Sequence, residues 1–156
     1  MEDSDSVRNS IDGAEVAHAV QAGSIGSLHI GGSVKRSDIR ESYKAAYSTL
    51  VAINSEASKI SWSVDSLRRA VKDLESRIAS LEGMSADFDL FAPHDVLRAF
   101  WAAQLAAALL RRCVVDDMVR AAVGRDGPGS DAYFAARNSM INATNTFVEK
   151  VRASIL

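Results

Sequence analysis

Residues 39–81 decide the fold, and they read IRESYKAAYSTLVAINSEASKISWSVDSLRRAVKDLESRIASL. Apolar residues recur through this stretch at alternating spacings of three and four, which makes an unbroken heptad repeat. Such a repeat is typical of a supercoiled helical seam. The sequence therefore predicts one long helix, about 65 Å in length at roughly 1.5 Å per residue. The a positions are Tyr43, Leu50, Ala57, Val64, Val71 and Ile78, and the d positions are Ile39, Ala46, Ile53, Ile60, Leu67, Leu74 and Leu81.

The two halves of this seam differ in composition. The second half has β-branched residues at a and leucine at d, a combination that favours a parallel pair of chains. We expect it to be a coiled-coil interface between two copies of the chain, most simply in a dimer. In the first half, Tyr47 and Val51 widen the apolar face, and Trp62 lies at an outward position, which indicates a second layer of helices. The predicted interface residues are Val64, Leu67, Val71, Leu74, Ile78 and Leu81.

The start and end of the long helix have local signals. Asp38, with Glu41 three residues later, resembles a capping box at the start. Gly83 is predicted to end the helix, because glycine commonly forms a left-handed C-terminal cap. Residues 84–92, which include Phe88, Leu90 and Phe91, are then expected to form a loop.

Two further helices are predicted after that loop. Pro93 suits a first helical position, and Gly124 would end the helix that it begins. Within it, residues 99–110 are apolar on nearly all sides, as in a central helix of a bundle. Ser130 can cap a last helix over 131–155, with an inward face of Tyr133, Met140, Thr144, Phe147, Val151 and Ile155.

The expected fold is therefore all-α. Residues 36–156 would form a three-helix bundle with a projecting coil, or a four-helix bundle if the long helix breaks near residues 61–63. Residues 1–35 make a separate glycine-rich segment in which short alternating apolar runs lie between glycines. That pattern is β-prone, but the segment is too short to bury enough surface to fold alone. It is expected to be disordered, to join another sheet or to stack on copies of itself.

The composition and the polar residues argue against several function classes. A formal net charge of −2 leaves no basic stripe for nucleic acid. The three histidines, His18, His29 and His94, do not form metal-ligand spacing with Cys113. Cys113 itself, in an apolar stretch, is expected to be a small buried side chain. We find no catalytic motif, so no enzyme activity, cofactor or metal is expected.

The chain also has no candidate for a membrane-spanning segment or a secretory signal. Its longest apolar run, residues 99–110, contains 12 residues, whereas a spanning helix needs about 20. The first residues are acidic and lack an apolar core of the kind that secretory signals have. The expected location is the cytoplasm.

Part of the glycine-rich segment carries a recognisable motif. Residues 9–13 read NSIDG, and residues 20–30 read VQAGSIGSLHI. This pattern resembles a bacterial amyloid signalling motif of actinobacterial proteins, related in pattern to the RIP homotypic interaction motif. Val20, Gln21, Ala22 and Gly23 match the core of that motif, although His18 and Ala19 replace its usual Gly-Pro. The motif residues are Asn9, Ile11, Gly13, Val20, Gln21, Ala22, Gly23, Ile25, Leu28 and Ile30.

The resemblance implies templated assembly, in which copies of the motif on a receptor and on an effector stack in register. The residues agree with this, because alternating apolar side chains can form a dry zipper and Gln21 an amide ladder. The first hypothesis is therefore a non-enzymatic signalling or adaptor protein that assembles through this motif and the coiled coil. One alternative is a helical effector that disrupts membranes through residues 99–110 and the arginines after them. Another is a coiled-coil structural subunit.

Overall fold

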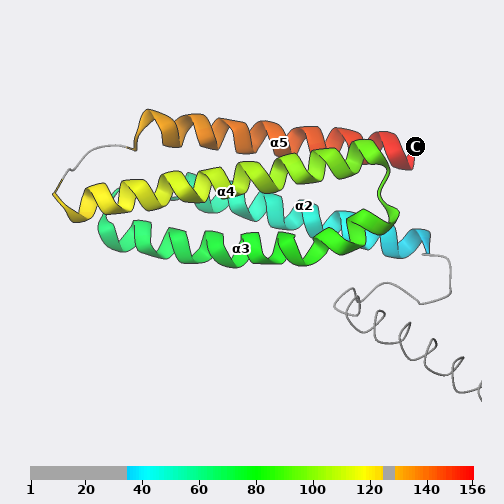
Figure 1. Ribbon diagram of the computed structural model, residues 1–156, viewed down its shortest axis with the longest axis horizontal. Helices are drawn as coiled ribbons and strands as arrows, with labels where there is room; N and C mark the ends of the chain where they lie inside the picture. The colour runs from blue at the N-terminus through cyan, green and yellow to red at the C-terminus, as the bar shows by residue number, and fades with distance from the viewer. Residues whose placement is uncertain (1–34, 125–128) are drawn as a thin grey trace, which may run out of the picture.

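The computed structural model describes residues 35–124 and 129–156. In these ranges the chain forms four helices: α2 (Arg36–Ser58), α3 (Val64–Phe91), α4 (His94–Ala122) and α5 (Asp131–Ile155). The helices lie side by side along the long axis of the molecule, each antiparallel to the one before it (Figure 1). α3 and α5 each contact both α2 and α4. The predicted all-α fold is confirmed in its four-helix form.

The predicted single helix over 39–81 is wrong, because the chain reverses between Lys59 and Ser63. The Lys59 backbone N–H donates to Glu56 O at 3.2 Å, which ends α2 in a tight turn. Ser63 Oγ accepts from the Ser66 backbone N–H at 3.2 Å and so caps α3. The predicted cap at Asp38 does not form either, since α2 begins at Arg36 and Glu41 instead pairs with Lys44.

The predicted helix end at Gly83 is also wrong. α3 continues through this glycine for two more turns, to Phe91, and the predicted loop over 84–92 is helical almost throughout. Tertiary packing explains the continuation, because it places Phe88 at 0% exposure between the helices. The gain from burying this ring exceeds the cost of about 1 kcal/mol for glycine inside a helix.

The heptad pattern nevertheless identifies the side of each helix that faces the core. None of the thirteen predicted a and d side chains is exposed in the four-helix bundle. Eight of them are buried: Tyr43, Ala46, Leu50, Ile53, Ala57, Leu67, Leu74 and Leu81. The same stripe runs on both sides of the turn because α2 and α3 pack against a common interior.

Aromatic rings close both ends of the core. At the end that holds the C-terminus, the Phe88 and Phe100 rings stack with centroids 4.0 Å apart, and Tyr43 and Phe147 lie beside them. At the other end, the Trp62 ring meets Tyr133 edge-on at 4.8 Å. Trp62, outward on the predicted seam, is packed against the core by α5, as the expected second layer of helices requires.

The predicted boundaries of α4 and α5 hold to within one residue, although Pro93 is the N-cap of α4 and His94, not Pro93, is its first helical residue. Gly124, with φ of 78°, lies directly after α4 and its C-cap residue, and Ser130 Oγ accepts from the Tyr133 backbone N–H at 3.2 Å. Most of the predicted inward face of α5 is buried. Tyr133, Met140, Thr144 and Phe147 are buried, whereas Val151 is half-buried and Ile155 is 49% exposed.

Candidate interaction surfaces

The residues singled out for the assembly motif, from Asn9 to Ile30, lie outside the described residues. The predicted coiled-coil residues lie on α3. Leu67, Leu74 and Leu81 are each 0% exposed within one chain, and Val64, Val71 and Ile78 are partly buried. The leucines are therefore core residues of the chain's own bundle, and the prediction that they face a second chain is wrong for this structure. Sequence periodicity shows an apolar face but not which helix covers it.

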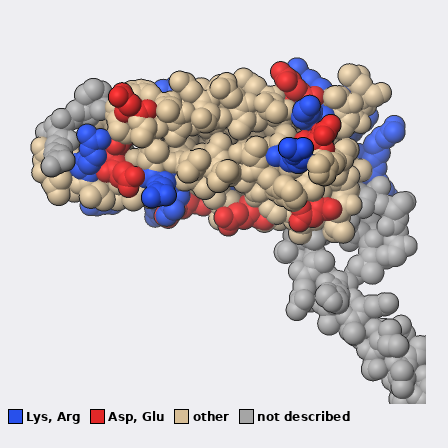
Figure 2. Space-filling model, turned by 45° about the horizontal axis from the view of Figure 1, so that its top comes forward, with Lys and Arg blue, Asp and Glu red and all other residues tan. Residues whose placement is uncertain are grey.

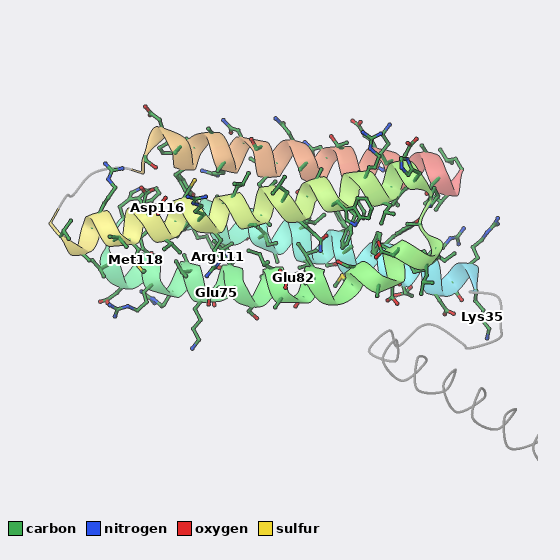
Figure 3. The ribbon with its side chains drawn as sticks, viewed as in Figure 1. Lys35, Glu75, Glu82, Arg111, Asp116 and Met118 are labelled. Carbon is green, nitrogen blue, oxygen red and sulfur yellow. The ribbon has the colours of Figure 1, made fainter. Side chains whose placement is uncertain are left out.

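Polar side chains on one flank of α3 contact α4. Arg111 of α4 reaches across to α3 and donates from Nη2 to Glu75 Oε1 at 2.5 Å (Figure 3). Gln104 of α4 donates to Ser85 Oγ of α3 at 2.8 Å. These contacts tie α4 to α3 along the flank of the bundle.

The outer side of α4 carries a row of exposed apolar side chains that the sequence pattern did not predict. Trp101, Leu105 and Leu109 follow one another at a spacing of four and are 48%, 63% and 48% exposed. The prediction of a central helix is therefore wrong for α4, since only one side of residues 99–110 faces the core. A spacing of four places these side chains together on one helix face.

This exposed face continues onto α5 without a charged residue. Residues 99–110 of α4 and 138–148 of α5 contain no Asp, Glu, Lys or Arg. They lie opposite one another, because Phe100 meets Phe147 at one end and Cys113 lies beside Ala132 at the other. Figure 2 shows the middle of this face uncharged, with charges gathered at its ends and lower edge. We call it the α4–α5 belt: Trp101, Ala102, Leu105, Ala108, Leu109, Ser139, Asn142 and Thr146.

A groove lies between α2 and α5. One hollow of about 310 Å³ is lined by Tyr47, Val148 and Arg152 among others, and it continues into a second of about 460 Å³ toward Ile141. A third, of about 390 Å³, extends it to Arg36 at the end of the bundle. We call this the α2–α5 groove. Its apolar lining includes Tyr47, Val51, Ile141, Val148 and Ile155.

The predicted burial of two of these lining residues is wrong. Tyr47 and Val51 were expected to lie under a second layer of helices, but they are 47% and 41% exposed. The bundle covers the seam beside them and leaves their side of α2 open. The chain's own helices therefore do not account for the wide apolar face of α2.

A short polar network lies beneath the groove. Asn54 Nδ2 donates to Thr144 Oγ1 at 2.9 Å, and that hydroxyl donates to Met140 O at 2.8 Å. The carbonyl oxygen of Asn54, Oδ1, is shielded from solvent and has no hydrogen-bond partner among the described residues. Together the two hydrogen bonds join α2 to α5 beneath the groove.

The ionisable groups at the other end of the bundle are structural. Asp117, 6% exposed, accepts from the Ser130 backbone N–H and hydroxyl, both at 3.3 Å, and so holds the start of α5. Burial, followed by the charges of Asp116 and Asp117, raises the pKa of the Cys113 thiol. The half-buried thiol is therefore held in its protonated, weakly nucleophilic form.

Within residues 35–124 and 129–156, no group of three or more His, Cys, Asp or Glu side chains could hold a metal ion. None of the helices in the described part of the chain is both long and apolar enough to cross a membrane. Comparisons with protein-family models, with curated proteins and with solved structures found no match. The surfaces of the bundle are therefore the basis for proposing a function.

Proposed function

We propose that this chain is a non-enzymatic adaptor, which gathers copies of itself through the N-terminal motif and then joins their bundles through the α4–α5 belt. The belt carries the proposal. Its α4 part groups the exposed apolar side chains of Trp101, Leu105 and Leu109, and large exposed apolar patches on folded chains mark interaction sites. Trp101 and Leu105 are of the residue types whose burial stabilises protein interfaces, and the belt has no charge to desolvate.

The motif supplies the clustering step of this proposal. Its alternating apolar residues and glycines suit an in-register stack, and Gln21 adds a side-chain amide that can bond along it. Clustering raises the effective concentration of the attached bundles, so that belts with a weak affinity associate. A receptor or effector with a matching motif would be the partner that seeds this stack.

Sedimentation velocity across a concentration series of the full chain tests the belt. Leu105→Glu should weaken self-association about tenfold or more, because association would bury an unpaired carboxylate. Leu90→Glu is the matched control: Leu90 is also 63% exposed, but it lies on α3. A chain that stays monomeric throughout, or equal effects of the two substitutions, would contradict the role of the belt.

The motif has a separate test. A synthetic peptide of residues 7–32 should form thioflavin-positive fibres that seed assembly of the full chain. Gln21→Pro in the full chain should abolish seeding, because proline removes a backbone donor from the stack, whereas Ser6→Pro, outside the motif, should not. A peptide that stays monomeric at high concentration would refute the clustering step.

A second candidate function uses the same belt against a membrane surface. Trp101 is flanked along the outer side of α4 by exposed Arg98 and Arg112, and tryptophan near basic residues is typical of membrane interfaces. If this is its role, clustered full chain should release dye from anionic vesicles, and Leu105→Glu should reduce the release. Vesicles that remain sealed would exclude it.

A further inference from the structure

The α2–α5 groove differs from the belt because it combines an apolar floor with a charged rim. On α5, exposed or half-buried apolar residues recur at a spacing of seven: Phe134, Ile141, Val148 and Ile155. Tyr47 and Val51 face Ile141 and Val148 from α2. A spacing of seven on one helix is the pattern that a second helix contacts in a coiled coil.

The rim of this groove is predominantly basic. Arg40, Lys44 and Arg152 line the first hollow, and Arg36 lines the hollow at its open end. Lys44 pairs with exposed Glu41, but none of the three arginines forms an ion pair within the described residues. Glu149, in the second hollow, is the sole acidic residue among those that line the three hollows. The electrostatic complement of this rim is an anionic partner.

The shape of the groove favours a helix over a small molecule. Lining residues on α2 run from Arg36 to Asn54, which spans roughly 27 Å at 1.5 Å per residue. That length matches a partner helix of about 18 residues.

We propose that the α2–α5 groove binds an acidic amphipathic helix of another protein. Apolar residues of that helix would lie against Val148 and Tyr47, and its flanking carboxylates would pair with Arg40 and Arg152. This is the helix-in-groove mode of recognition, with the bundle contributing two of the three helices in contact. The inference is independent of the assembly proposal, because it uses a different surface and requires no clustering.

The probe is a fluorescein-labelled peptide of about 18 residues, with leucine and isoleucine at a and d, asparagine at one central a position and glutamate on both flanks. Its twin has lysine in place of every glutamate. Fluorescence anisotropy with the full chain should show the glutamate peptide binding at least about tenfold more tightly, with a preference that decreases at high salt. Equal binding of the two peptides, or no binding of either, would overturn the proposal.

Substitutions test whether the peptide binds in the α2–α5 groove. Arg40→Glu with Arg152→Glu should reverse the preference between the peptides, and both side chains are exposed, so folding is preserved. The matched control is Lys72→Glu with Arg77→Glu, which makes the same charge change on exposed positions of α3. Ile141→Ser should weaken binding of both peptides, while Val119→Ser on α4 should not. Retained preference in the Arg40 and Arg152 variant would overturn the proposal.

Other occupants would give different results. A dimer that dissociates on Ile141→Ser without peptide would show that a second copy fills the groove. Binding to anionic vesicles that depends on Arg40 and Arg152, with no peptide binding, would identify a lipid. Either result would overturn the proposal that an acidic helix occupies the groove.

Discussion

The hydroxyl of Tyr133 holds the end of α2 to α5, and removing it tests the break in the heptad helix. Tyr133 is 1% exposed, and its hydroxyl donates to Ala57 O at 2.6 Å. Ala57 lies in the last turn of α2, where carbonyls lose their intrahelical donors. Tyr133→Phe would therefore remove the hydrogen bond and leave a buried carbonyl without a donor.

The expected cost follows from that geometry. A lost buried hydrogen bond that strands its partner costs about 1–3 kcal/mol, so we expect about 2 kcal/mol of unfolding free energy. For a domain of this size, that loss lowers the melting temperature by about 4–8 °C. Urea unfolding followed by circular dichroism measures the free energy, and a thermal scan measures the shift.

Tyr47→Phe is the matched control. It removes the same hydroxyl from a side chain that is 47% exposed and donates to no described residue. Its effect should stay within about 0.5 kcal/mol. Equal effects of the two substitutions would refute the reasoning, because in a helix continuous through residues 59–63 the Ser61 N–H would supply the donor for Ala57 O.

The same hydroxyl predicts a dependence on pH. Burial raises the pKa of Tyr133, so the folded state disfavours the phenolate. Stability attributable to this group is present below the unfolded pKa of about 10 and is lost as pH rises toward the folded value. The difference in stability between the wild-type chain and Tyr133→Phe should therefore shrink above about pH 10.

Three further results are expected. Gly83→Ala, inside α3 with open space around its Cα, should stabilise the chain by about 0.5–1 kcal/mol. Gly124→Ala, at a φ of 78°, should destabilise it by about 1 kcal/mol. Urea unfolding of both variants measures whether the two changes in stability have opposite signs. Cys113 should react with a thiolate-specific reagent more slowly in the folded chain than in urea, and equal rates would contradict the raised pKa. Gly129→Ala should cost about 1–3 kcal/mol, because its methyl group would overlap the Trp62 ring; an unchanged melting temperature would show that this ring can move aside.

The surfaces were less predictable than the helices. The spacing of seven from Phe134 to Ile155 is visible in the sequence, but so is the inward face of α5 from Tyr133 to Phe147. Two apolar faces on one helix compete for the interior, and periodicity alone does not rank them. Packing against α4 decides it, since Phe147 packs against Phe100 and leaves Ile141 and Val148 on the groove.

The sequence by itself determined the all-α class, the caps at Gly124 and Ser130, and the apolar face of residues 39–81. These depend on local spacing, capping groups and backbone conformation, which neighbouring residues carry. Only the tertiary structure decided that this face folds back at residues 59–63. A continuous coil and an antiparallel hairpin bury the same heptad positions. The heptad pattern therefore does not distinguish the two arrangements. The difference is made by contacts from far along the chain: the Trp62 ring on Tyr133, and the Tyr133 hydroxyl on the carbonyl that ends α2.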